Sequence, residues 1–248
     1  MSDMEADDGG ERIFNVSVEG NIGSGKSTFL SALAEGKDSV LGIGIGGANA
    51  CFPDFQIYPE PVGQWCGMDA PDGKKINLLR EFYEQPKRRA AALQSFVLLT
   101  QIKMLAQQKR GVRVVERLAG SSAFLEIGRR CENLDEIEYA VLKEWYSTIH
   151  SDPRFGLRPH MIIYLQTDPW VAFARMQDRG RSEESGVSLE YVELLHEYHE
   201  NWLVRREENA PDCHVVCINV NGDLASTAEK YRYAKEAMIH LAASHFEF

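Results

Sequence analysis

The sequence has few basic residues, few cysteines and no long apolar run. Its 248 residues include 27 lysines and arginines against 37 acidic residues, for a net charge of −10. Proteins that bind nucleic acid or membrane surfaces usually present a basic field. This balance therefore favours a small-molecule partner and predicts neither a nucleic-acid nor a membrane partner. No apolar stretch approaches the roughly 18–20 residues of a transmembrane helix.

Targeting signals are also missing from the first residues. Residues 1–11 have neither the apolar core of a secretory signal nor the arginine-rich, acid-poor character of a mitochondrial transit peptide. We expect a disordered acidic tail at 1–11 and one domain over residues 12–248. The five cysteines are an odd number scattered along the chain, which fits reduced thiols. These features predict a cytoplasmic protein, with the nucleus as an alternative location.

Apolar and amphipathic segments alternate along the chain. Strands are expected at 12–19, 55–58, 112–115, 160–166 and 214–220. Helices are expected at 27–34, at 87–110, from a cap at Asn133 and Glu136 to residue 149, after Asp168 and Pro169, at 189–206, and from Ser226 to about residue 243. The pattern predicts an α/β fold with a five-stranded parallel sheet flanked by helices.

A glycine-rich phosphate loop lies between the first expected strand and helix. The pattern Gly20-x-x-x-x-Gly25-Lys26-Ser27 places backbone N–H groups around phosphates at a helix N-terminus. Lysine reaches the β- and γ-phosphates in such loops, and the serine hydroxyl binds Mg²⁺. The predicted ATP-binding residues here are Gly20, Asn21, Ile22, Gly23, Ser24, Gly25, Lys26, Ser27 and Thr28. A GTPase is disfavoured, because the chain has no Asn-Lys-x-Asp motif.

A second glycine-rich segment spans residues 42–50. Gly42, Gly44 and Gly47 have the spacing of a dinucleotide-binding turn. That turn needs a strand before it and a helix after it, whereas this segment follows an expected helix and precedes none. We therefore interpret it as a flexible inserted loop without a phosphate-binding role.

Carboxylates and arginines follow the other expected strands. Glu60 ends the second strand, where it could accept the proton of an attacking hydroxyl group. Glu116 and Arg117 end the third, with the acid facing a metal. Three arginines follow the fourth strand and could clamp a phosphoryl group or form a solvated charged surface: Arg175, Arg179 and Arg181.

Taken in order, the motifs resemble those of the deoxyribonucleoside kinase family, which includes deoxycytidine, deoxyguanosine, mitochondrial thymidine and multisubstrate kinases. The resemblance spans residues 14–203 and rests on VEGNIGSGKST, PEPVGQW, FYEQPKR followed by Leu93-Gln94, VVERL, and RGRSEESGVSLEYVELLHEYHENWL. It implies a P-loop kinase with an arginine-bearing lid. The implied reaction transfers the γ-phosphate of ATP, with Mg²⁺, to the 5′-hydroxyl of a deoxyribonucleoside.

The resemblance also implies roles for single residues. Lys26, Glu60 and Arg117 are the implied catalytic residues, with Glu60 as general base and Arg117 near the 5′-oxygen. Ser27 and Glu116 lie on the Mg²⁺ side, and the three arginines close over the ATP phosphates. The implied nucleoside-binding residues are Glu60, Trp65, Tyr83, Gln94, Gln101, Arg117, Phe124 and Glu184. Within this set, Tyr83 and Glu184 bind the sugar 3′-hydroxyl and Gln94 binds the base edge. The family also implies a homodimer formed through a helix bundle that includes the long helix from residue 87.

The match departs from the family after Arg117. Leu118 stands where the family has serine, and the next segment is about two residues short. With a gap there, Phe124 stacks on the base; without one, Ser122 takes a base-contacting position. Gln101 replaces an arginine of the purine and cytidine enzymes, which favours a broad or thymidine-like preference. The rival hypotheses are a nucleoside monophosphate kinase and a non-catalytic P-loop regulator.

Overall fold

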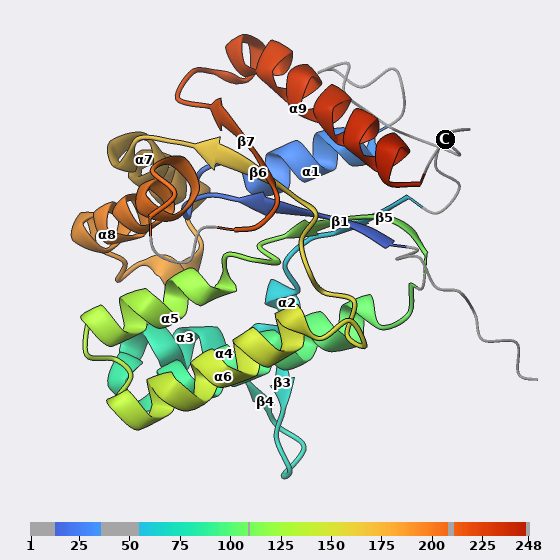
Figure 1. The fold of residues 1–248 in the computed structure, drawn as a ribbon. Coiled ribbons are helices and arrows are strands. Elements are labelled where there is room, and N and C mark those ends of the chain that lie inside the picture. Colours follow the sequence, from blue (N-terminus) through green and yellow to red (C-terminus); the bar gives the residue numbers. More distant parts are fainter. Residues whose placement is uncertain (1–12, 36–54, 109, 208–210, 247–248) are drawn as a thin grey trace, which may run out of the picture.

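A computed structural model describes residues 13–35, 55–108, 110–207 and 211–246 (Figure 1). The expected tail at 1–11 and the glycine-rich segment at 42–50 lie outside the described residues. Within the described ranges, no helix is both long enough and apolar enough to span a membrane.

The centre of the molecule is a five-stranded sheet in which every neighbouring pair is parallel. The strand order is β2-β5-β1-β6-β7. The bounds are Ile13–Glu19 for β1, Gln56–Tyr58 for β2, Gly111–Glu116 for β5, Met161–Gln166 for β6 and His214–Asn219 for β7. The predicted α/β architecture with five parallel strands is therefore confirmed. Parallel strands present their carboxyl ends to one crevice, and here that crevice is bordered by the loop after β1.

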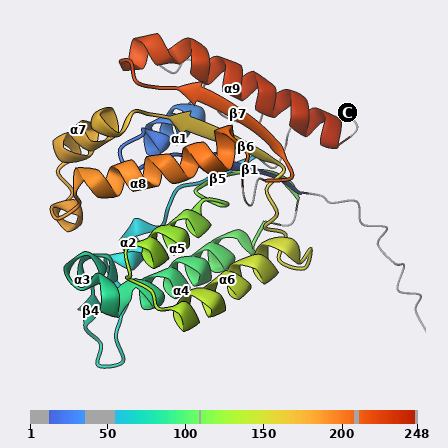
Figure 2. The ribbon, with the colours of Figure 1, turned by 60° about the vertical axis from the view of Figure 1, so that its left-hand side comes forward.

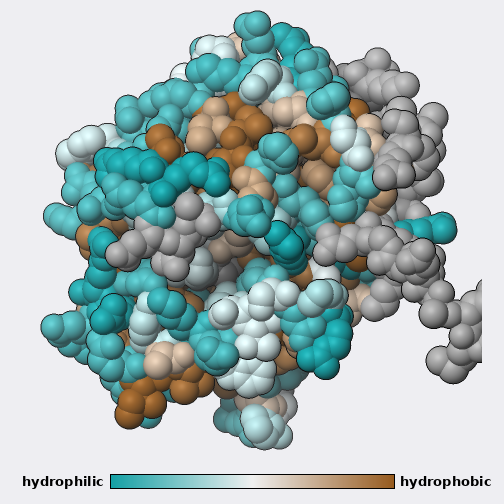
Figure 3. All heavy atoms as spheres, in the orientation of Figure 1, coloured by the Kyte–Doolittle hydropathy of each residue, from teal (hydrophilic) through white to brown (hydrophobic). Residues whose placement is uncertain are grey.

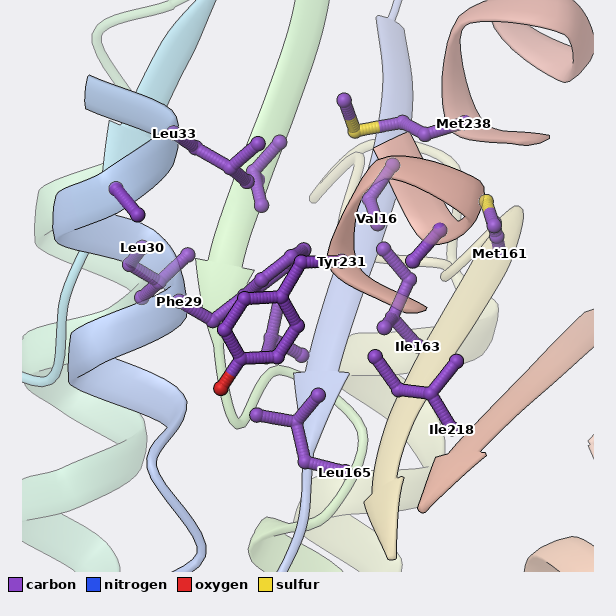
Figure 4. Close-up of a cluster of buried hydrophobic side chains, with 14 of the residues drawn as sticks. Val16, Phe29, Leu30, Leu33, Met161, Ile163, Leu165, Ile218, Tyr231 and Met238 are labelled. Carbon is purple, nitrogen blue, oxygen red and sulfur yellow. The ribbon is translucent and has the colours of Figure 1, made fainter. Parts of the chain in front are cut away.

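Two helices, α1 (Lys26–Ala34) and α9 (Leu224–His245), cover one face of the sheet (Figures 1 and 2). Phe29 and Leu33 of α1 and Tyr231 of α9 pack against Val16 and Ile163 in an apolar cluster (Figure 4). The rings of Phe29 and Tyr231 lie 4.9 Å apart, so the two helices contact each other as well as the sheet. This packing holds the start of α1, and with it the phosphate loop, in place.

The opposite face carries most of the remaining helices (Figure 2). A second apolar cluster joins β5 to five of them: α2 (Val62–Trp65), α3 (Leu78–Glu84), α4 (Pro86–Leu105), α5 (Ser121–Arg130) and α6 (Glu136–Ser151). The chain continues through α7 (Pro169–Arg179), α8 (Leu189–His199) and a π-helical segment, Glu200–Val204, which packs on β6 through Trp202. A short antiparallel hairpin, β3 (Met68–Asp69) with β4 (Lys75–Ile76), was not expected from the sequence.

Two predicted helix starts were wrong. Helix α6 is capped by Asp135, two residues after Asn133, whose side chain accepts from the amides of Ile137 and Glu138. Helix α9 is likewise capped by Asp223, which accepts from the amide of Ser226, so that residue lies inside the helix. In both cases an aspartate close to the predicted cap, and not the predicted residue itself, accepts from the free N–H groups of the first turn.

The helix expected over 189–206 changes to π-helical geometry after His199. Trp145 is 58% exposed on α6. Near the edge strand β7, Cys213 is half-buried and Cys217 is exposed.

Candidate active site

A cavity of about 730 Å³ opens at the carboxyl ends of β1, β2 and β5. It brings together residues from elements that are distant in sequence, including the phosphate loop, α3, α4, α5 and α7. Most of the predicted site residues line it: Ile22, Gly23, Gly25, Lys26, Ser27, Thr28, Glu60, Trp65, Tyr83, Gln94, Glu116, Arg117, Phe124, Arg175, Arg179, Arg181 and Glu184. Gly20, Asn21, Ser24 and Gln101 do not appear among its lining residues.

The phosphate loop is held by backbone geometry that requires glycine. Gly20 and Gly23 have φ values of 146° and 77°, in the left-handed region. A side chain at Gly23 would also collide with the carbonyl oxygen of Ala172 on α7. Asn21 donates to the Val192 carbonyl at 2.8 Å, so its side chain ties the loop to α8 and does not line the cavity.

Lys26 is the first residue of α1 and is buried. Its Nζ donates to the carbonyl oxygens of Gly20 at 3.1 Å and Asn21 at 2.8 Å, so the ammonium group lies inside the curve of its own loop. Burial, assisted by positive Arg117 and opposed by Glu116, lowers the pKa of Lys26 to about 8. A phosphate would restore a negative partner to this partly desolvated cation.

Ser27 and Glu116 form a cluster of oxygen ligands beside the loop. The Ser27 hydroxyl donates to the Glu116 carboxylate at 3.2 and 3.3 Å, and the Glu60 amide donates to Glu116 Oε2 at 3.4 Å. Hydroxyl and carboxylate oxygens are the ligands that Mg²⁺ prefers, usually together with substrate phosphates. The donor set present here therefore fits a magnesium ion.

Arg117 connects the two halves of the cavity. Its Nε lies 3.1 Å from Glu60 Oε1, its guanidinium donates to the Gly20 carbonyl at 3.4 Å, and its Cζ lies 4.7 Å from the centre of the Phe124 ring. Burial alone would lower the pKa of Arg117, but the carboxylates of Glu60, Glu19 and Glu116 raise it. The residue thus stays charged and holds the Glu60 carboxylate between phosphate loop and pocket. Ser122, the alternative base-contacting residue, donates to the Ala119 carbonyl and does not line the cavity.

The inner half of the cavity is mostly apolar. Its wall includes Trp65 and four residues to which the sequence analysis assigned no role in the site: Leu79, Phe82, Leu93 and Val97. The spacing of Leu93 and Val97 on one side of α4, next to Gln94, was the available signal. Sequence reasoning also missed two residues that orient this wall. Thr100 accepts from Trp65 Nε1 at 3.0 Å, and Tyr146 donates to the side-chain oxygen of Gln94 at 3.4 Å.

Gln101, which the resemblance places among the nucleoside-binding residues, contacts the backbone of Arg117. Its side-chain amide donates to the carbonyl oxygen of Arg117 at 2.9 Å. The geometry therefore places Gln101 behind Arg117, where it supports the backbone of a cavity residue.

The segment after α7 brings arginines onto a carboxylate. Arg179 and Arg181 lie 2.5 and 2.7 Å from the two oxygens of Glu184, which is buried. Arg175 donates instead to the Gly222 carbonyl at 2.7 Å, on the turn before α9. Burial, and then the nearby Glu184, raises the pKa of Tyr83, so its phenol remains a hydrogen-bond donor.

Comparison with known proteins identifies the family. The model of the family described as deoxynucleoside kinase matches residues 48–241, well over half of the chain. The chain belongs to the deoxynucleoside kinase family. The family and the enzyme class expected from the motifs, a deoxynucleoside kinase, are thereby confirmed.

Three relatives illustrate the range of this kinase family. The chain is 28% identical to deoxycytidine kinase 2 of Gallus gallus, covering 90% of this chain and 88% of that protein. It is 27% identical to the mitochondrial deoxyguanosine kinase of Xenopus laevis, with 88% and 85% covered. It is 30% identical to the mitochondrial thymidine kinase 2 of Macaca fascicularis, with 77% and 64% covered. These relatives are named for three different nucleosides.

Proposed function

We propose that this kinase transfers the γ-phosphate of ATP to the 5′-hydroxyl of a deoxyribonucleoside. The observation that carries the proposal is the Glu60–Arg117 ion pair, at the junction between a phosphate loop and an apolar pocket. A carboxylate at this place can receive the proton of a hydroxyl that faces the loop. The apolar wall suits a nucleobase, and the phosphate loop suits a triphosphate.

In the proposed reaction, the 5′-oxygen attacks the γ-phosphorus of ATP. The new bond joins that oxygen to phosphorus, the bond to the β-phosphate oxygen breaks, and the proton goes to Glu60. Arg117 holds the Glu60 carboxylate and stabilises charge near the 5′-oxygen. Lys26 and the loop N–H groups bind the triphosphate, and preorganised donors of this kind stabilise a transferring phosphoryl group.

The same proposal assigns Mg²⁺ to Ser27 and Glu116, whose oxygens are adjacent. When bound, the ion would neutralise charge on the β- and γ-phosphates. Glu116 also accepts a hydrogen bond from the backbone amide of Glu60. The proposed metal ligand and the proposed base are therefore in direct contact, which supports placing the metal next to the base.

We further propose that Arg175, Arg179 and Arg181 form a lid over the phosphates. All three line the cavity, and two of them hold Glu184. Glu184 and the protonated phenol of Tyr83 are assigned to the sugar 3′-hydroxyl. Such a hydroxyl can donate to the carboxylate and accept from the phenol.

For the base, the proposal is a broad or thymidine-like preference. The support is a largely apolar wall in which the Gln94 amide offers one donor and one acceptor group. Gln101 occupies the position of an arginine in the purine and cytidine enzymes, and its side-chain amide donates a hydrogen bond to the Arg117 carbonyl.

The test is a rate panel over the four deoxynucleosides with ATP and magnesium, with the product identified as a 5′-monophosphate. Activity on thymidine and at least one other nucleoside is expected. Rapid phosphorylation of thymidine monophosphate, with no reaction of thymidine, would instead indicate a nucleoside monophosphate kinase. ATP binding without any phosphorylated product would contradict the proposal.

We propose in addition that the enzyme is a homodimer. Ile137, Val141 and Trp145 recur every fourth residue on α6 and are 76%, 52% and 58% exposed. Figure 3 shows hydrophobic residues exposed at the lower left, where Figure 1 places the first half of α6. A continuous apolar stripe of this kind is typical of an interface. Analytical ultracentrifugation should give twice the chain mass, and Val141→Asp should give the monomer mass.

The proposed location is the cytoplasm, with the nucleus as the alternative. The four cysteines within the described residues are all free thiols, which supports a reducing compartment. Fluorescence microscopy of a tagged full-length chain tests the location.

A further inference from the structure

Glu19 is a buried carboxylate that the proposed reaction does not use. It is the last residue of β1, directly before Gly20, and its side chain is fully enclosed. Burial raises the pKa of its carboxyl group, although the Ser17 hydroxyl and the positive Arg117 both oppose that shift. A buried ionisable group is costly unless its hydrogen bonds are made, so its contacts indicate what it does.

Those contacts converge on the turn that follows β5. Glu19 Oε1 accepts from the amides of Ala119 at 3.0 Å and Gly120 at 2.8 Å, and also from the Ser17 hydroxyl. The Ser17 oxygen itself accepts from the amides of Leu118 at 2.9 Å and Ala119 at 3.0 Å. Three successive amides therefore end on two side chains of β1.

The turn begins with a backbone conformation that needs support. Arg117 has a φ of 58°, in the left-handed region, where a residue with a side chain is strained unless its surroundings hold it. Its amide donates to the Val18 carbonyl at 3.0 Å, and its carbonyl accepts from Gln101. Gly120 packs directly on the Glu19 carboxylate. A side chain at position 120 would collide with that carboxylate, so only glycine fits.

We propose that Glu19 is a positioning residue, which with Ser17 fixes the turn at 118–120 and so holds the Arg117 guanidinium against Glu60 and the phosphate loop. The inference rests on the role proposed for Arg117. A carboxylate suits this task, because charged acceptors make shorter and stronger bonds to backbone N–H groups than neutral ones. When ionised, this carboxylate also acts electrostatically on the two buried cations of the site and raises the pKa of both Lys26 and Arg117.

The test is a double-mutant cycle between Glu19 and Arg117, measured as kcat and KM for ATP and nucleoside. Glu19→Ala should lower kcat by about 100-fold and change each KM by less than about threefold. Glu19→Gln, which keeps an oxygen acceptor at the same place, should recover most of that loss. In an Arg117→Lys background, Glu19→Ala should cost less than about threefold, because coupled residues are not additive.

A matched control is Glu200→Ala. Glu200 is a part-buried carboxylate that also accepts side-chain hydrogen bonds, from Tyr164 at 2.9 Å and Gln166 at 3.0 Å, but it does not line the cavity. This variant should lower the melting temperature and leave kcat unchanged. If Glu19→Ala fails to fold, Ser17→Ala serves instead, because it removes the acceptor of two of the three turn amides, those of Leu118 and Ala119. It should lower kcat and show the same non-additivity with Arg117→Lys.

The outcomes separate this inference from the function on which it rests. Full activity of Arg117→Lys would overturn the role proposed for Arg117. A strong loss in Arg117→Lys together with full activity of Glu19→Ala or Ser17→Ala would overturn the positioning role alone. Equal losses from Glu19→Ala with and without Arg117→Lys would show that Glu19 acts independently of Arg117, and would also overturn it.

Discussion

Arg113 and Arg117 lie four residues apart in the sequence, the first within β5 and the second just after its end. Both are almost fully buried, with exposures of 2% and 6%. At the amino end of the sheet, Arg113 donates to the carbonyl oxygens of Leu105, Gln108 and Gly156. At the carboxyl end, Arg117 is surrounded by the carboxylates of three glutamates. At one end of the sheet, a buried arginine donates hydrogen bonds to backbone carbonyl oxygens. At the other end, a buried arginine is placed among carboxylates.

The pKa directions express this difference. Burial lowers the pKa of Arg113, with only a partial opposing effect from Tyr58. Burial acts on Arg117 in the same direction, but its carboxylates outweigh it and raise the pKa. Buried cations are thus tolerated for two reasons, either hydrogen bonds to carbonyl oxygens or compensating negative charge. Only the second arrangement supplies a carboxylate that can react.

The largest expected effect comes from removing the reacting carboxylate. Glu60→Gln keeps the side-chain shape but cannot accept the 5′-proton, so kcat should fall by about 1,000-fold. Nucleoside affinity, measured by calorimetry, should change little. Glu81→Gln, on the surface near Arg89, is the control and should keep full activity. Near-normal turnover of Glu60→Gln would contradict the assignment of the base.

Replacing Arg117 should lower kcat, whereas replacing Arg113 should lower the free energy of unfolding. Arg117→Lys keeps a charge but loses the fixed guanidinium fork, so kcat should fall by about 100-fold with little change in the free energy of unfolding. Arg113→Met leaves buried carbonyl oxygens without donors and should lower the free energy of unfolding by about 2 kcal/mol, with kcat within about twofold. Urea unfolding and steady-state kinetics measure both. If the two variants lost kcat and unfolding free energy to a similar extent, the different roles assigned to Arg113 and Arg117 would be contradicted.

The lowered pKa of Lys26 predicts that kcat/KM for ATP falls at alkaline pH. Burial and the neighbouring Arg117 lower that pKa to about 8, so Lys26 is charged below this pH and neutral above it. The kcat/KM for ATP, which reports the free enzyme, should therefore be level below pH 8 and fall about tenfold per pH unit above it. Lys26→Arg stays charged and should lack this alkaline fall. A fall that persists in Lys26→Arg would assign the titration to another group.

The smallest expected effect concerns Gln101. Because its amide donates to the Arg117 carbonyl, Gln101→Met should lower kcat by only about threefold, and by the same factor for all four deoxynucleosides. A rate panel with wild type and variant measures this. A change in the order of preference among the bases would instead place Gln101 in base recognition.

Local sequence was sufficient for the parts of the site that depend on neighbouring residues. The glycine pattern of the phosphate loop can be recognised from a short segment, and Glu60 and Glu116 follow from their position at strand ends in a parallel sheet. Prediction was weaker where two residues compete for one role. Asp135 and Asp223 displaced the predicted caps because side chains a few residues apart can reach the same amides.

By itself, the sequence determined the fold class, the phosphate loop and most of the residues that line the cavity, because these follow from short motifs and strand order. Only the tertiary structure decided that Gln101 supports Arg117 and that Glu19 and Ser17 bind the turn after β5. The physical reason is that each of these contacts joins separate elements of the chain. Their partners are set by packing at about 3 Å, which no spacing along one segment encodes.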